Sequence, residues 1–402
     1  MLVTVHPGFG TPHAPPLRVG LLWHSASSPN LGVGALTVAQ IAVLDDISRE
    51  IGRRIEIEII GWVDERPAYV DRDDVKIHGI RLKNFLPVGE SLVRIFRDLD
   101  VVIDIGAGDS FADIYGRQRF VTQAVSKALV LAARRPLVLA PQTLGPFDGR
   151  INRFVAARIV ERASLAFSRD QQTTRFVREF CPKADIREAT DLAMALPFTR
   201  PAGDAERVGT KVGMNVSSLL MEPDASKKFG LAFSYPDYVR RAIRQILDRP
   251  ETELHLVPHV IPTDNPAEDD YAASERLRDE FPSLEIAPAF RGPSEAKTYI
   301  ASLDAFTGAR MHSCIAAFSS SVPVLPVAYS RKFEGLFSTL GYERLVDLKN
   351  HDIDAALDRQ ARFLDELPAV RDEVSVSYAR VQDRLHTYRE ALLGLVTGIA
   401  AS

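Results

Sequence analysis

The stretch from residue 100 to residue 140 reads DVVIDIGAGDSFADIYGRQRFVTQAVSKALVLAARRPLVLA, and it decides the fold class. The apolar, β-branched run Asp100–Ile105 predicts a buried strand that ends in a glycine-rich turn. Apolar residues at helical spacing follow over Arg117–Ala133, and a second apolar run, Pro136–Ala140, completes the pattern. A strand, a helix and another strand in this order indicate two parallel strands joined by a crossover helix.

The same alternation extends in both directions from this stretch, except over Leu196–Thr210, where the periodicity is lost. The other predicted strands are Leu17–Trp23, Arg54–Gly61, Ser164–Ser168, Lys211–Val216, Glu253–Pro258, Asp304–Gly308 and Pro323–Ala328. The sequence therefore predicts an α/β protein with two doubly wound, Rossmann-like domains that face a cleft. We expect a loose arm over residues 1–16, domains over 17–200 and 201–365, and a helical segment over 366–402 that packs back across the domains.

Composition excludes several classes of protein. Of the 402 residues, 46% are hydrophobic and 25% are charged, which is typical of a globular chain. The net charge of -4 gives no overall attraction for nucleic acid, so we expect no nucleic-acid partner. Cys181 and Cys314 have no metal-ligand spacing, and we expect neither a metal nor a resident cofactor. We find no secretory signal and no apolar stretch of the ~20 residues that span a membrane, which predicts a cytoplasmic protein.

Candidate ligand-binding residues in the first half follow its predicted strands, where sheets of this kind bind ligands. They are Asn30, in the glycine-containing turn before a helix; Gly108 and Asp113, after the strand at 100–105; Gln142, after the next strand; and the pair Arg169 and Asp170. Each has a simpler interpretation, because turns need glycine and an aspartate before a helix often caps it. We expect Asp113 or Asp170 to accept a proton and Arg169 to bind an anion.

Candidates in the second half also follow strands. Asn215 and Ser217 are small polar residues suited to a phosphate or a carboxylate, and His259 either contacts the ligand or is simply a half-buried imidazole. The sharpest motif is Thr307-Gly308-Ala309-Arg310-Met311-His312-Ser313, at a predicted helix start. There Arg310 is suited to an anion and His312 to proton transfer, although a capping arginine with a packed histidine is the alternative. Lys332 lies in a basic turn that either binds an anion or is simply solvated.

Taken in order, these motifs resemble those of the polysaccharide pyruvyl transferase family. The resemblance runs from about Leu17 to Leu348 and rests on the order and spacing of several motifs rather than on one of them. They are Asn30-Leu31-Gly32, Gly106–Asp113, Gln142–Phe147, Ser168-Arg169-Asp170, Ala189-Thr190-Asp191, Asn215-Val216-Ser217, Val257-Pro258-His259 and Gly308–His312. It implies a fold similar to the GT-B glycosyltransferases, with the acceptor bound by the first domain and the donor by the second.

The resemblance also implies the reaction. The pyruvyl group of phosphoenolpyruvate is transferred to two hydroxyls of a sugar, which forms a cyclic ketal and releases phosphate. Arg310 and His312 match the family's donor motif, and Arg169 matches its first-domain arginine. The sugar acceptor is lipid-linked, nucleotide-linked or polymeric, with peripheral membrane association as one option, and the oligomeric state stays open. Two alternatives are a GT-B glycosyltransferase that uses a nucleotide sugar and a saccharide-binding protein without catalytic activity.

Overall fold

The computed structural model describes residues 15–85, 91–200, 209–261 and 266–401. The chain divides into two compact units. Unit 1 comprises residues up to Ser28, Leu36–Ala195 and Asp383–Ser402, and unit 2 comprises Pro29–Ala35 and Leu196–Gln382. Residues 1–14 of the expected arm and residues 201–208 of the expected boundary lie outside the described residues.

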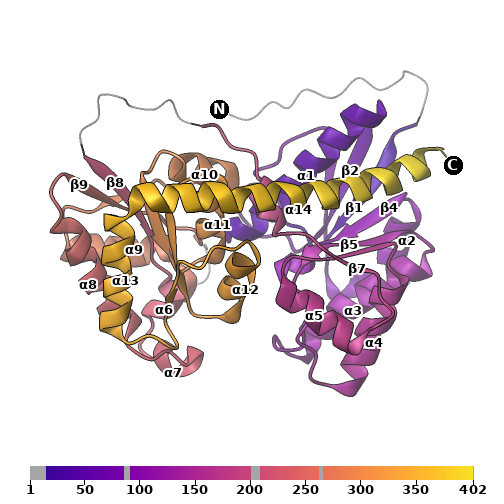
Figure 1. Ribbon diagram of the computed structural model, residues 1–402. Helices are drawn as coiled ribbons and strands as arrows, with labels where there is room; N and C mark the ends of the chain where they lie inside the picture. The colour runs from indigo at the N-terminus through magenta and orange to yellow at the C-terminus, as the bar shows by residue number, and fades with distance from the viewer. Residues whose placement is uncertain (1–14, 86–90, 201–208, 262–265, 402) are drawn as a thin grey trace. The chain divides into compact units, whose positions relative to one another are not determined.

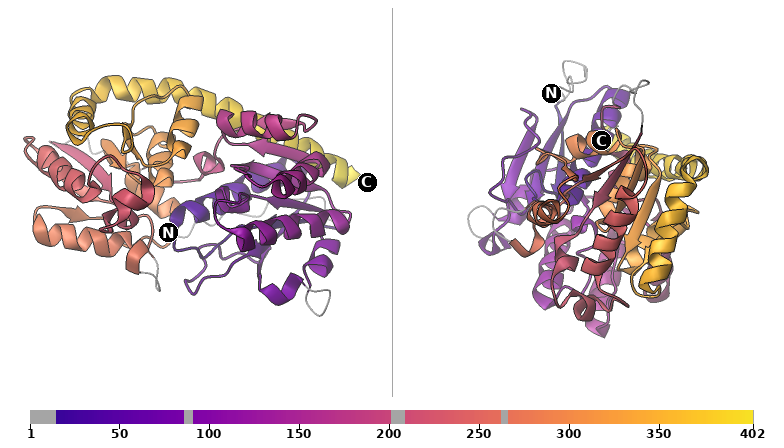
Figure 2. Two further views of the ribbon diagram at one scale, coloured as in Figure 1. Left: turned by 90° about the horizontal axis from the view of Figure 1, so that it is seen from below. Right: turned by 90° about the vertical axis from the view of Figure 1, so that its left-hand side faces the viewer.

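Unit 1 is built on a seven-stranded parallel sheet with helices on both of its faces (Figures 1 and 2). Its strand order is β3-β2-β1-β4-β5-β6-β7. The strands are β1 (Leu17–Leu22), β2 (Ile55–Gly61), β3 (Val75–Gly79), β4 (Val101–Asp104), β5 (Leu137–Gln142), β6 (Leu165–Ser168) and β7 (Ile186–Glu188). The helices are α1 (Leu31–Ile51), α2 (Leu92–Arg97), α3 (Arg117–Ala132), α4 (Arg150–Arg162) and α5 (Gln171–Phe180). The chain turns from β1 to one side of the sheet and later from β4 to the other, which is a Rossmann-like topology.

Unit 2 repeats this topology with six parallel strands in the order β10-β9-β8-β11-β12-β13. They are β8 (Thr210–Asn215), β9 (Thr252–Leu256), β10 (Glu285–Ile286), β11 (Ala305–Gly308), β12 (Val324–Ala328) and β13 (Val346–Asp347). The helices are α6 (Ser218–Met221), α7 (Ala225–Phe229), α8 (Tyr235–Leu247), α9 (Asp270–Glu280), α10 (Pro293–Ile300), α11 (Met311–Ser319), α12 (Arg331–Thr339) and α13 (Ile353–Asp365). The reversal of strand order lies between β8 and β11.

The predicted α/β class with two Rossmann-like halves is confirmed, and every strand predicted from an apolar run is present. The structure adds short strands that the sequence analysis missed: β3, β7, β10 and β13. All four are the edge strands of their sheets. Every residue of β3, which has the sequence VKIHG, is exposed or half-buried. An edge strand buries little side chain, so it lacks the continuous apolar run by which central strands are found.

Two helices contribute to both units. The last helix, α14 (Leu367–Ala401), begins in unit 2 and ends in unit 1. Its unit 1 part is fixed by the Tyr388 hydroxyl, which donates to Gln40 Oε1 at 2.6 Å, and by Arg384, which contacts Glu188 at 2.6 Å. The first turn of α1 belongs to unit 2 and the rest to unit 1, whereas the sequence analysis placed all of this segment in the first domain.

Helix α1 is also the one helix of the described chain that is long and apolar enough to cross a membrane by length and composition. Within its apolar window, 61% is buried inside the structure. A core helix of a Rossmann-like unit has the same composition, because it packs against the apolar strands of its own sheet.

Candidate functional site

The candidate site of unit 2 lies where β9, β8 and β11 end side by side. Asn215, the last residue of β8, is 1% exposed and joins these three strand ends. Its Oδ1 accepts the backbone N–H of Arg310 at 2.9 Å, and its Nδ2 donates to the Val257 carbonyl at 2.9 Å. The amide predicted to bind the substrate is therefore used to align the strand ends that position Arg310.

Asp270, the first residue of α9, is the centre of this site and is fully buried. Its carboxylate accepts Nη2 of Arg310 at 2.8 Å and Nε at 3.2 Å. It also accepts the backbone N–H groups of Ser218 at 3.0 Å and Val260 at 3.1 Å, and the Ser218 hydroxyl at 3.1 Å. Asp270 was not predicted from the sequence; its neighbour Asp269 caps α9.

Arg310 lies between β11 and α11, and its side chain is 11% exposed. Burial by itself would lower the pKa of the guanidinium, but the adjacent Asp270 carboxylate outweighs this effect and raises the pKa above its usual value. Asp270 occupies Nε and Nη2, while Nη1 has no hydrogen bond to a described residue. The fork is thus permanently charged, fixed along one edge and open along the other.

His312 is the second residue of α11 and packs against the first turn of α1. A Cβ atom added to Gly32 would lie 2.4 Å from Nδ1 of His312, so only glycine permits this approach. The turn is fixed by Asn30, whose Oδ1 accepts the Gly32 N–H at 3.0 Å, and by Leu31, whose N–H donates to the His259 carbonyl at 3.1 Å. The predicted loop at Asn30 therefore belongs to the Arg310 site.

His259 and Ser217 add buried polar groups without charge. Both imidazole nitrogens of His259 and the hydroxyl oxygen of Ser217 are buried and have no hydrogen-bond partner among the described residues. Burial, aided by the charge of His312 and Arg310, lowers the pKa of His259 to about 3. His259 is therefore neutral at ordinary pH. Lys332 lies in the first turn of α12, directly after β12, and is half-buried.

A second cluster lies at the corresponding edge of unit 1, around Arg169. This side chain follows β6, is 1% exposed and pairs through Nη1 with Asp191 Oδ2 at 3.0 Å. Burial opposes its charge, but Asp191, Asp109 and Asp170 together raise the pKa of the guanidinium above its usual value. Nε and Nη2 have no hydrogen-bond partner among the described residues, although Asp170 Oδ2 lies 3.9 Å from Nε. Asp170 also caps α5, accepting the Thr173 N–H at 2.7 Å.

Gln142 and Gly108 lie at the same edge of unit 1. Gln142 is fully buried, and its Nε2 donates to the Asp104 carboxylate at 3.0 Å. Asp104 in turn pairs with the buried Lys127 at 2.9 Å. Gly108 has a φ of +88°, and its carbonyl accepts the Thr143 N–H at 2.9 Å. Gln142 was predicted to bind the ligand, and in the structure its amide joins β5 to β4.

Asp113 holds a loop together. Its Oδ2 accepts the backbone N–H of Asp148 at 2.7 Å and Nδ2 of Asn152 at 3.0 Å, at the start of α4. Partial burial would raise the pKa of this carboxyl, but the hydrogen bonds outweigh it and lower the pKa. A carboxylate with a lowered pKa is a weak base, so this geometry does not favour the expected role in proton transfer.

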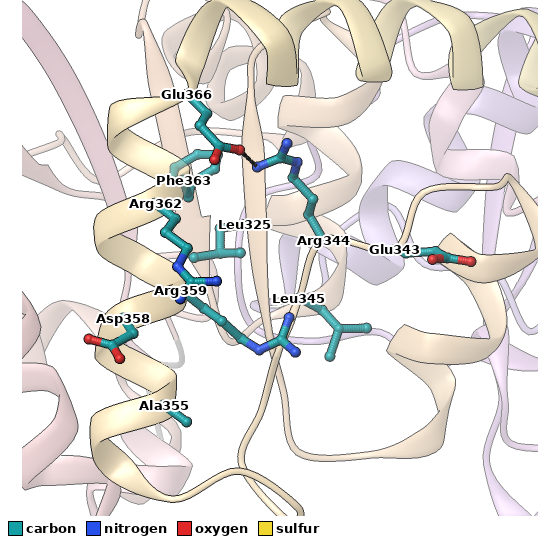
Figure 3. A pocket seen from close by; sticks show the side chains of 10 residues that line it. All are labelled: Leu325, Glu343, Arg344, Leu345, Ala355, Asp358, Arg359, Arg362, Phe363 and Glu366. Atoms are coloured by element: carbon teal, nitrogen blue, oxygen red, sulfur yellow. Dashed lines mark hydrogen bonds and ion pairs between the residues drawn. The ribbon is translucent and has the colours of Figure 1, made fainter.

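Two further observations complete the search for sites. Across the described chain, no group of three or more His, Cys, Asp and Glu side chains is arranged to hold a metal ion. A pocket away from Arg310 lies against α13, with Arg344, Arg359 and Arg362 among the residues that line it (Figure 3). Three acidic side chains line the same pocket, and Glu366 pairs with Arg344 at 2.7 Å, so its charge is balanced.

Known proteins that are similar to this chain identify its family. The family profile for polysaccharide pyruvyl transferase matches residues 39–331, which is most of the chain. The protein belongs to this family. The match includes Arg169, Arg310 and His312, while Asn30 lies before it and Lys332 lies one residue beyond its end. No curated protein matches the sequence.

Solved structures similar to this pyruvyl transferase family member share its fold at low sequence identity. An α,α-trehalose-phosphate synthase (UDP-forming) from Burkholderia vietnamiensis is 11% identical with a TM-score of 0.53, and the match covers 97% of this chain and 100% of that one. A UDP-N-acetylglucosamine 2-epimerase is 12% identical with a TM-score of 0.53, covering 93% and 96%. S. aureus MnaA with UDP is 11% identical with a TM-score of 0.52, covering 87% of each chain. These likenesses confirm the GT-B type of fold.

Proposed function

We propose that this protein transfers the pyruvyl group of phosphoenolpyruvate to two hydroxyls of a sugar, forming a cyclic ketal and releasing phosphate. The observation that supports this proposal is the pairing of a fixed guanidinium, Arg310, with His312 at the start of the same helix. The donor half of this reaction needs a cationic group that binds the anionic donor and an acid that protonates it. The proposed transfer uses phosphoenolpyruvate as a substrate and no metal or resident cofactor.

The charge at the unit 2 site favours an anion. The Arg310–Asp270 pair is neutral as a whole, but its carboxylate is fully buried and its guanidinium retains an open edge. The N-terminal turns of α1 and α11 add the positive ends of two helix dipoles. In our proposal the open edge of Arg310 and these turns bind one anionic group of phosphoenolpyruvate, and Lys332 assists.

His312 supplies the proton in the proposed mechanism. It protonates the methylene carbon of phosphoenolpyruvate, which makes C2 electrophilic in the manner of an oxocarbenium ion. One sugar hydroxyl attacks C2 and loses its proton. Phosphate then leaves with its bonding electrons, and the second hydroxyl attacks C2 and loses its proton to close the ketal. The C2–C3 π bond is used to form the new C–H bond, and the C2–O bond to phosphate is broken as phosphate leaves, so that C2 gains two C–O bonds to the sugar. One proton is added to carbon and two leave the hydroxyls, to the base and to the departing phosphate.

The unit 1 cluster suits the sugar better than a second anion. Arg169 has three carboxylates in its electrostatic environment, so the cluster as a whole offers an anion little attraction. Its Nε and Nη2 atoms, which have no hydrogen-bond partner among the described residues, instead suit the oxygen atoms of a polyhydroxylated acceptor. We therefore assign Arg169 to the acceptor, contrary to the expectation that it binds an anion. Because the pKa of Asp113 is lowered, Asp170 is our candidate for the base.

The decisive experiment measures phosphate release and product mass. The protein is incubated with phosphoenolpyruvate and a panel of saccharides, and we expect one product to gain the mass of pyruvate minus water. His312→Ala should abolish phosphate release while phosphoenolpyruvate binding, measured by calorimetry, is retained. Full turnover by His312→Ala would exclude the histidine from the chemistry. Thermal stabilisation by UDP-sugars but not by phosphoenolpyruvate would favour a glycosyltransferase instead.

A further inference from the structure

Unit 1 exposes a group of large apolar side chains at one end of two helices. Ile151 is 78% exposed and Phe154 is 61% exposed in the first turns of α4, and Ile114 is 54% exposed in the loop before α3. Tyr115 and Val121 are also exposed there. We call these five residues the α3–α4 tip. Exposed apolar residues that gather in this way indicate a binding surface, whereas isolated ones are ordinary.

Hydrogen bonds join the two segments that carry the tip residues. The Asp113 carboxylate, next to Ile114, accepts Nδ2 of Asn152, next to Ile151, at 3.0 Å. It also accepts the N–H of Asp148 at 2.7 Å, which fixes the loop before α4 to the loop before α3. Helices α3 and α4 pack against each other and lie side by side (Figure 1). The loop before α3 and the start of α4, which carry the tip residues, are therefore fixed to each other.

The helices that carry the tip, α3 and α4, also carry exposed arginine side chains. They are Arg117, Arg119, Arg150, Arg153 and Arg158. Arg119 lies 5.1 Å from the Tyr115 ring centre and Arg158 lies 5.2 Å from that of Phe154, so cations and aromatic rings share one face. Neither helix has an acidic residue in its first turn. Four carboxylates lie in the same region: Glu161, which pairs with Arg158 at 2.9 Å, the exposed Asp148, and the half-buried Asp113 and Asp109, the last of which accepts the Tyr115 hydroxyl at 2.7 Å. Among the exposed side chains, five arginines therefore face two carboxylates, which is an excess of positive charge.

We propose that the α3–α4 tip docks the protein on an anionic lipid bilayer. The apolar side chains enter the boundary between headgroups and acyl chains, and the arginines bind lipid phosphates. Arg117 and Arg150 begin their helices, where a cation opposes the helix dipole, and an anionic surface relieves that repulsion. A second copy of the chain is a poorer occupant, because a symmetric contact would place the five arginines against their own copies.

Vesicle co-sedimentation tests this proposal without phosphoenolpyruvate or an acceptor, so its outcome is independent of the proposed activity. We expect the protein to sediment with phosphatidylcholine vesicles that contain about 30% phosphatidylglycerol, to bind pure phosphatidylcholine at least about tenfold more weakly, and to lose binding as salt rises. Ile151→Glu with Phe154→Glu, and separately Arg117→Glu with Arg150→Glu, should each weaken binding by about tenfold or more.

Two control variants test whether vesicle binding depends on the tip or on any exposed apolar or cationic side chain. Val376→Glu replaces a residue of α14 that is 66% exposed, and Arg178→Glu replaces an exposed arginine of α5 in the same unit. Both should bind vesicles as the wild type does, and circular dichroism should show all variants folded. Absence of wild-type binding to the anionic vesicles, or equal losses in the controls, would overturn the proposal. So would sedimentation velocity showing a wild-type dimer that the tip variants dissociate.

Discussion

Arg169 in unit 1 and Arg310 in unit 2 are largely buried arginines placed where a strand ends and a helix begins, although their strands, β6 and β11, hold different places in the two sheets. Each follows a buried strand, precedes a helix and pairs with an aspartate from another segment. Their surroundings differ. Three carboxylates raise the pKa of Arg169. The pKa of Arg310 is raised chiefly by one carboxylate, that of Asp270, and Arg310 itself lies directly before the first turn of α11. The comparison teaches that two arginines at similar strand-to-helix junctions can have quite different charge surroundings, and in our proposal this difference assigns them different ligands.

The largest expected effect comes from removing the aspartate partner of each arginine. Asp270→Ala leaves the Arg310 charge buried without its main partner and should lower the free energy of unfolding by about 3 to 5 kcal/mol. Asp191→Ala should cost less, about 1 to 3 kcal/mol, because Asp170 and Asp109 still act on Arg169. Urea unfolding measures both.

A double variant shows whether the stability lost in Asp270→Ala is due to the unpaired charge of Arg310. Asp270→Ala combined with Arg310→Met removes both charges and should regain at least half of the lost stability. Equal costs for the two single aspartate variants would contradict the distinction between the two clusters.

Next in size is the pH dependence of stability, to which each unit contributes one buried histidine. Burial lowers the pKa of His24 in unit 1 to about 3, and burial together with His312 and Arg310 lowers the pKa of His259 in unit 2 to about 3. As pH falls from about 6.5 towards 3, the unfolded chain binds protons that the folded chain does not, so stability is lost. Each histidine should contribute a loss of about 1 to 3 kcal/mol at pH 4.

Denaturant unfolding across that pH range measures the effect. His24→Gln and His259→Gln should each flatten the curve. His386→Gln is the matched control, because that side chain is 71% exposed, and it should leave the curve unchanged. A curve as steep in both buried variants as in the wild type would rule out these histidines as the cause.

The smallest expected effect tests the approach of α1 to His312. In Gly32→Ala the new Cβ would meet Nδ1 of His312, so the ring must move, and phosphate release should fall by about tenfold, or about 1.4 kcal/mol in activation free energy. Gly394→Ala is the control, since nothing lies within 4 Å of a Cβ there. It should keep full activity and gain up to about 1 kcal/mol of stability. Wild-type activity in Gly32→Ala would show that the position of the ring is not critical.

Much of the fold and part of the site were predictable from sequence. Apolar runs such as Val101–Asp104 identified the central strands, because a strand buried on both faces has a continuous apolar sequence. The motif containing Arg310 and His312 was found because a strand end followed by a helix start is a recurring ligand position. The edge strand β3 escaped prediction, since its residues are mostly exposed or half-buried and show no such run.

The partners of the charged residues could not be predicted from the sequence. Asp270 was not among the predicted site residues, and only the packing of α9 against the ends of β8 and β11 turns its carboxylate towards Arg310. Asn30 looked like a first-domain residue until its turn was found to contact His259 and Val260.

The sequence by itself determined the two parallel sheets, the order of their elements and the residue types at the strand ends. These depend on local periodicity and on short-range turn chemistry, which neighbouring residues specify. Only the tertiary structure decided which charges meet, which imidazoles are buried and neutral, and which helix turn packs against His312. Those properties depend on distances between residues far apart in the chain and on the exclusion of water around them, and the linear sequence records neither.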